Sequence, residues 1–189
     1  MKRSFLPPLA LSTALALGLI GGVSAAQYTT LDTEASRISF GYSQMGVGME
    51  GNFSEVQATR FSFDPADPEA AQVAIEIPLS SIDAGYDDAN TELVKSEWLN
   101  LADHPRAQFE SSTVEALGDN RFQVTGELSI KGQAKEVTAP FTFKEEDDTG
   151  IFEGSFTFQR GDFAIGEGSW SDSSIVAGDI QINFQFVAR

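Results

Sequence analysis

The sequence predicts an all-β fold in which about eight short antiparallel strands curl into a lipocalin-like barrel, with one helix (about 85–104) over one end. Apolar and polar residues alternate in short runs along most of the chain, Gly, Pro and Asp separate these runs, and helical spacing is confined to one stretch. Alternation with a period of two is typical of strands that bury one face. A barrel of eight strands has room for one small ligand, although the alternation alone leaves open a filled barrel without a cavity.

The clearest strand pair runs from Asn120 to Phe143. Phe122, Val124, Leu128 and Ile130 alternate with polar residues, and after Lys131-Gly132-Gln133 the alternation resumes. Because glycine tolerates the positive φ of a tight reversal, we expect a hairpin that turns at Gly132. Such a pair cannot bury its apolar face alone and requires a larger sheet around it.

The other predicted strands are shorter and are separated by turn residues. The glycines at 46, 48 and 51 are expected to end the first strand, and Asp64-Pro65 is expected to end the second. The predicted strands cover residues 38–42, 52–63, 73–79, 107–115, 122–130, 136–144, 152–158 and 180–186.

One segment has the spacing of an amphipathic helix. Leu93, Val94, Trp98 and Leu101 recur at helical spacing, and His104-Pro105 is expected to end the helix. The apolar side of this helix is expected to lie across one end of the sheet.

The N-terminus has the order of a secretory signal peptide. Lys2 and Arg3 precede the apolar run Leu9–Ile20, and small residues follow. The run is short for a membrane span, so a retained membrane anchor is the less favoured alternative. We therefore expect a signal peptide at 1–25, export to the periplasm and a single domain at 26–189.

Composition excludes several classes of function. The formal net charge of −16 disfavours nucleic acid and anionic bilayers as partners. The absence of Cys excludes disulfides and thiolate chemistry, and a single His argues against a histidine metal site, so we expect no metal and no catalytic cofactor.

Two other classes of function compete with ligand binding. A catalytic carboxylate pair would have to come from Asp87-Asp88, Asp147-Asp148 or Asp162. Since no nucleophile motif or phosphate loop appears, we expect no enzymatic activity. A non-catalytic protein-interaction module with a filled core remains the alternative, and the sequence leaves open whether the chain forms a homodimer.

Four motifs follow one another along the chain. They are Gly51-Asn52-Phe53, the segment from Leu93 to Leu99 with His104-Pro105 and Phe109, the segment from Val124 to Gly132, and the segment from Arg160 to Gly166. With these motifs the chain resembles the YceI-like family of periplasmic proteins. It departs from that family at Tyr42-Ser43-Gln44, where the family usually carries a His.

The resemblance implies a lipocalin-like barrel around an elongated apolar tunnel that binds a polyisoprenoid, such as ubiquinone or an isoprenoid pyrophosphate, for transport, storage or stress response. Lys95, His104 and Arg106 lie near the predicted helix end and are candidates for contact with a head group. The residues expected to line the tunnel are Phe40, Tyr42, Phe53, Phe61, Phe63, Val73, Ile75, Phe109, Phe141, Phe156, Phe158, Ile182 and Phe184.

Overall fold

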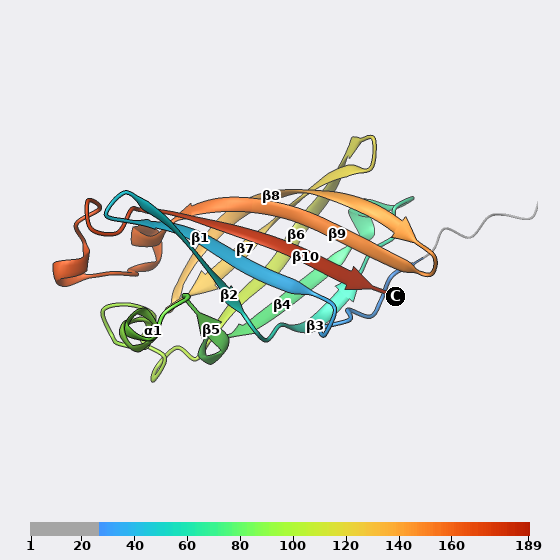
Figure 1. Ribbon diagram of the computed structural model, residues 1–189. Coiled ribbons are helices and arrows are strands. Elements are labelled where there is room, and N and C mark those ends of the chain that lie inside the picture. Colours follow the sequence, from blue (N-terminus) through green and yellow to red (C-terminus); the bar gives the residue numbers. More distant parts are fainter. Residues whose placement is uncertain (1–26) are drawn as a thin grey trace, which may run out of the picture.

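The computed structural model describes residues 27–189, so the predicted signal peptide lies outside the described residues. These residues form a single 10-stranded antiparallel sheet in the order β3-β4-β6-β7-β8-β9-β10-β1-β2-β5. The prediction of an all-β fold with one helix is confirmed (Figure 1). The elements are β1 (Arg37–Gln44), β2 (Val47–Phe53), β3 (Gln57–Ser62), β4 (Gln72–Pro78), β5 (Ile82–Asp83), α1 (Asp87–Leu93), β6 (Arg106–Gly118), β7 (Arg121–Ile130), β8 (Gln133–Glu146), β9 (Thr149–Gln159) and β10 (Asp179–Ala188).

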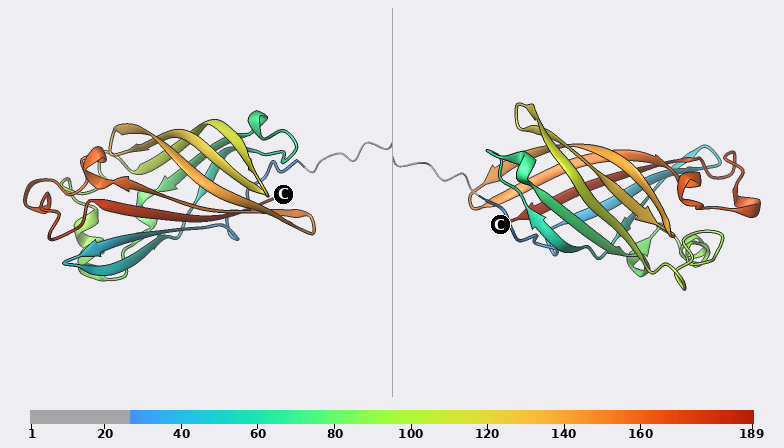
Figure 2. Two further views of the ribbon diagram at one scale, coloured as in Figure 1. Left: turned by 90° about the horizontal axis from the view of Figure 1, so that it is seen from above. Right: turned by 180° about the vertical axis from the view of Figure 1, so that it is seen from behind.

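The sheet curls around an interior, so that β1 and β2 lie across from β6 and β7 (Figures 1 and 2). Its two edge strands are β3 and β5, and short contacts link them to other strands. The N-terminal segment bridges Tyr28 to Phe63 and Leu31 to Ala188, so it joins the end of β3 to the end of β10. The backbone N–H of Ser54 donates to the carbonyl oxygen of Ser81, 3.0 Å away, next to the β2–β5 pair. These links connect the ends of the two edge strands to the rest of the described chain.

The predicted central hairpin is confirmed. β7 and β8 pair from Arg121↔Thr142 to Ile130↔Gln133, and the turn residues Lys131 and Gly132 have φ values of 49° and 73°. A two-residue turn with both φ values positive matches the right-handed twist of the flanking strands.

The second predicted strand, 52–63, was wrong as a single element. Phe53 ends β2, and the chain leaves the sheet before β3 begins at Gln57. The break is required because β2 pairs with β1 and β5, whereas β3 pairs with β4. With this division and the two-residue β5, the sheet has ten strands rather than about eight.

The glycines after β1 also behave differently from the prediction, because Gly48 and Gly51 lie inside β2. Gly51 is needed there because the Phe40 ring packs directly over its backbone. A Cβ at position 51 would lie 2.3 Å from Cζ of Phe40. The glycine marks a close aromatic contact within the sheet rather than a turn.

The predicted helix is present but short, ending at Leu93 rather than near 104. The chain then forms successive turns that bury Trp98 and Leu99, and the carbonyl oxygen of Glu97 accepts hydrogen bonds from the N–H groups of Gly166 and Glu167, both 2.8 Å away. In a continued helix that carbonyl would be engaged within the helix, so the tertiary contact with the 160–170 loop replaces helical pairing. As predicted, this region covers one end of the sheet (Figure 1).

Candidate ligand-binding cavity

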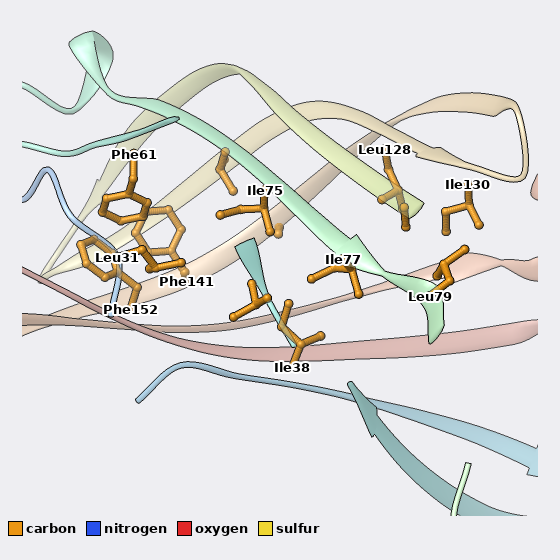
Figure 3. Packing of buried hydrophobic residues seen from close by; sticks show 14 of the residues in the cluster. Leu31, Ile38, Phe61, Ile75, Ile77, Leu79, Leu128, Ile130, Phe141 and Phe152 are labelled. Atoms are coloured by element: carbon orange, nitrogen blue, oxygen red, sulfur yellow. The ribbon is translucent and has the colours of Figure 1, made fainter. Parts of the chain in front are cut away.

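The curled sheet encloses a cavity of about 470 Å³. Its wall consists mostly of the inward-facing residues of the strands, including Ile38 on β1, and Ile75 and Ile77 on β4. Figure 3 shows aliphatic and aromatic side chains from opposite sides of the barrel pointing toward one another, with Phe61, Phe141 and Phe152 at one end and Leu79, Leu128 and Ile130 at the other. The interior is therefore not solid, as a filled barrel would be.

Every residue expected from the sequence to line the tunnel lies on the wall of this cavity. Alternation along each strand predicted which residues face inward, and the family resemblance predicted that this inward face surrounds a cavity. Their contact with a lipid stays a prediction. The set is Phe40, Tyr42, Phe53, Phe61, Phe63, Val73, Ile75, Phe109, Phe141, Phe156, Phe158, Ile182 and Phe184.

An aromatic cluster fills the end of the barrel near the chain termini. Phe63 is 2% exposed, and its ring centroid lies 5.0 Å from that of Phe152, 5.2 Å from that of Phe143 and 5.3 Å from that of Phe122. Tyr28 packs edge-on against Phe143 at 5.3 Å. These contacts fill this end of the interior with aromatic side chains.

The opposite end, beside α1, carries most of the polar groups of the wall. Tyr42 and Gln44 reach it from β1, and Tyr86 reaches it from the residue before α1. The Tyr86 hydroxyl donates to Oε1 of Gln44 at 2.6 Å, and the Tyr42 hydroxyl donates to the carbonyl oxygen of Ala84 at 3.2 Å. Burial and the neighbouring Tyr86 phenol raise the pKa of Tyr42 to about 12, so this phenol is neutral at physiological pH.

Helix α1 adds two carboxylates to the same end. Asp88 and Glu92 are four residues apart and line the cavity together with Ala89 and Leu93. A spacing of four residues places the two carboxylates on the same face of the helix. Of the carboxylates considered as catalytic candidates, Asp88 is the one on the cavity wall. Asp147 and Asp148 lie in the β8–β9 turn.

Sequence reasoning missed Arg160, a buried cation on the cavity wall that is 4% exposed. Its guanidinium carbon lies 5.8 Å from the ring centroid of Trp98, within reach of a cation–π interaction. Burial lowers the pKa of Arg160, and its charge is balanced by backbone dipoles rather than by a carboxylate. The signal was present in the Arg160–Gly166 motif, but nothing in the spacing revealed its partners. Its N–H groups donate to the carbonyl oxygens of Ile165, Gly166, Trp170, Val176 and Ala177 at 2.7–3.1 Å.

The basic residues predicted to contact a head group do not line the cavity. Lys95 forms an ion pair with Glu92, and Arg106 pairs with Glu76 at 3.2 Å. The imidazole of His104 packs beside Gly132 in the β7–β8 turn. The cation on the cavity wall is therefore Arg160, and none of the three basic residues predicted from the sequence lies there.

Two further observations concern chemistry and membranes. Over residues 27–189, no group of three or more His, Asp or Glu side chains is arranged to hold a metal ion. In the same part of the chain, no helix combines the length and the apolarity that a membrane crossing requires.

Comparisons with known proteins agree with this architecture. A UPF0312 protein of Azotobacter vinelandii is 34% identical over 174 residues, which cover 87% of this chain and 88% of that protein. A UPF0312 protein of Pseudomonas savastanoi is 31% identical over an alignment of 199 residues, which covers all of this chain and all of that protein.

Solved structures give the same result. BcnA of Burkholderia cenocepacia superimposes with a TM-score of 0.81 at 36% identity, covering 85% of this chain and 100% of BcnA. A polyisoprenoid binding domain from Saccharophagus degradans shares the fold with a TM-score of 0.66 at 14% identity, covering 87% and 98% of the two chains. The YceI-like domain matches residues 29–188, which is nearly the whole part described, and the chain therefore belongs to the YceI-like family.

Proposed function

We propose that this protein binds one elongated apolar lipid, of the polyisoprenoid class, and holds its tail away from water inside the barrel. The observation that carries the proposal is the cavity of about 470 Å³ with a wall of aliphatic and aromatic side chains from most strands. Ligand cavities in proteins are typically about 300–1,000 Å³. A branched hydrocarbon makes no directional demands, so a continuous apolar wall is sufficient to hold it.

The energetics favour the wall as the main source of affinity. A large ligand gains about 0.3 kcal/mol per non-hydrogen atom, so a chain of about 20 carbons gains about 6 kcal/mol. An exposed charge pair contributes about 0–1 kcal/mol. The tail therefore supplies most of the binding energy, and the head group sets orientation and selectivity.

The comparisons support this proposal at the level of the fold. The Saccharophagus domain, described as a polyisoprenoid binding domain, has the same curled sheet, and its low identity makes the likeness one of architecture. The cavity chemistry of this chain carries the rest. The function is non-catalytic, and the lipid is carried or stored rather than transformed.

We further propose that the lipid is bound in the periplasm, after export directed by residues 1–25. The order of basic, apolar and small residues at the N-terminus supports this location. Carriage or storage of a water-insoluble chain between membranes requires a soluble shell, and the excess of Asp and Glu over Lys and Arg provides a well-hydrated surface.

Mass spectrometry of the bound lipid tests the proposal. The full chain is produced with export in a bacterial host and purified without detergent, and its organic extract is analysed. We expect a prenyl lipid at near one molecule per protein, and a strongly reduced amount with Phe184→Asp, which places a charge on the cavity wall. Lipid-free wild-type protein that also fails to bind added prenyl compounds would refute the proposal.

A further inference from the structure

Resting on the proposed function, we propose that the cavity selects a lipid with an uncharged head group bearing a hydroxyl or carbonyl, and discriminates against a phosphate head group. The proposal concerns the α1 end of the cavity, where Tyr42, Gln44 and Tyr86 meet the helix face of Asp88 and Glu92. It follows from three properties of this end: its hydrogen-bonding groups, its charge, and the engagement of its buried cation.

The hydrogen-bonding groups complement a hydroxyl. The protons of the Tyr42 and Tyr86 hydroxyls are used within the protein, in the bonds to Ala84 and to Gln44, so both oxygens retain lone pairs that can accept. The Gln44 amide nitrogen donates to no group among residues 27–189 and is therefore available as a donor. A head group that both donates and accepts, or that accepts alone, can satisfy these groups when its tail fills the cavity.

The charge at this end is negative. Asp88 forms no ion pair with another described residue, and Glu92 is matched by Lys95 alone. Asp83, in the adjoining β5, accepts hydrogen bonds from the Asn90 amide and the Gly85 N–H, which lower the pKa of its carboxyl and keep it ionised. An approaching phosphate would therefore meet carboxylates of the same sign.

The buried cation cannot compensate for these carboxylates. Arg160 is the only Lys, Arg or His on the cavity wall within residues 27–189. Each of its N–H groups already donates to a backbone carbonyl oxygen. A guanidinium has five N–H donors and no more, so contact with a phosphate would require breaking bonds that hold the 160–177 loop. Its charge remains, but it offers a ligand no free donor.

A matched pair of lipids tests the proposal. Geranylgeraniol and geranylgeranyl diphosphate have the same tail and differ in head group, so the ratio of their dissociation constants isolates the head group. Binding is followed by tryptophan fluorescence of delipidated protein, because the chain has two Trp and both Trp98 and Trp170 line the cavity. We expect the alcohol to bind at least about tenfold more tightly at low salt, equivalent to about 1.4 kcal/mol. The ratio should shrink as salt screens the carboxylates.

Charge-neutralising variants identify the residues responsible. Asp88→Asn and Glu92→Gln, singly and together, should strengthen diphosphate binding relative to alcohol binding. The larger change is expected for Glu92→Gln, which also frees the Lys95 ammonium from its ion pair. Asp119→Asn is the control, because Asp119 is exposed in the β6–β7 turn, outside the cavity wall, and beside Arg121. Gln44→Ala should weaken alcohol binding about fivefold, because it removes the free amide donor and the acceptor of the Tyr86 hydroxyl.

The outcomes separate this inference from the proposed function. Equal binding of the two lipids, or tighter binding of the diphosphate, would overturn the head-group selectivity while leaving lipid binding intact. If neither lipid bound, the proposed function and the inference would fall together. A tenfold preference that persists in the Asp88 and Glu92 variants would show that these carboxylates do not cause it.

Discussion

Phe184→Asp is the most direct perturbation of the cavity wall. Phe184 lies on β10, opposite Gly154 of β9 and Ile38 of β1, and it is half-buried. Its ring covers Gly154, since a Cβ at that glycine would lie 2.5 Å from Cζ of Phe184, and it stacks on Phe186 with centroids 5.3 Å apart. The substitution removes this ring and puts a carboxylate on the apolar wall.

The cost of the carboxylate depends on whether the cavity is occupied. In the empty protein, water can enter the cavity and hydrate the carboxylate, so the fold should survive. When a lipid tail fills the cavity, the same carboxylate is desolvated with no partner, which costs several kcal/mol. With about 3 kcal/mol lost on binding, affinity should fall at least about 100-fold.

The assay is tryptophan fluorescence titration with geranylgeraniol, accompanied by far-UV circular dichroism to confirm the β-rich fold. Gln181→Asp is the matched control, because it adds the same charge to an exposed position of the same strand and is absent from the cavity wall. A folded Phe184→Asp protein that binds within about threefold of the wild type would show that the tail does not occupy this cavity.

The remaining predictions concern stability, ionisation and export. Arg160→Met removes a buried, fully bonded guanidinium and leaves several carbonyl oxygens unpaired. The free energy of unfolding measured in urea should therefore fall by about 3–5 kcal/mol. A loss below about 1 kcal/mol would contradict the role of Arg160 in holding the loop. Gly51→Ala should destabilise the fold by about 1–3 kcal/mol, because the new methyl meets the Phe40 ring, and Gly48→Ala, with open space around its Cβ position, is the control. The pKa of Tyr42 is raised in the folded protein, so its contribution to stability is present below pH 10 and is lost as pH rises toward about 12; absorbance titration at alkaline pH should lose its latest phase in Tyr42→Phe. Deletion of residues 1–25 should leave the protein in the cytoplasm, and continued export on cell fractionation would contradict the signal-peptide assignment.

Some parts of the fold and site could be predicted from local chemistry. The β7–β8 hairpin was predictable because alternation and Gly132 specify it within a few residues of each other. The cavity wall was predictable for a related reason, since residues on the inward face of successive strands must meet when the sheet curls. Phe40, Val73 and Phe156 come from distant parts of the chain; their inward faces followed from the alternation, and their place on a tunnel wall followed from the family resemblance.

Other parts depended on contacts between distant segments. The helical spacing through Leu101 indicated a long helix, but the Glu97 carbonyl bonds to Gly166 and Glu167 instead, so the helix ends at Leu93. Lys95 was a reasonable candidate for head-group contact by position, yet it is neutralised by Glu92.

The sequence by itself determined the strand periodicity, the apolar inward face and the acidic exterior, because each of these is a property of neighbouring residues. The tertiary structure decided which end of the barrel is filled and which end is polar. Aromatic residues far apart in the chain, such as Tyr28, Phe63 and Phe143, pack into one cluster, and Arg160 receives its carbonyl partners from a loop that folds back over it. Such pairings depend on how the sheet closes, and closure is set by contacts that no local pattern records.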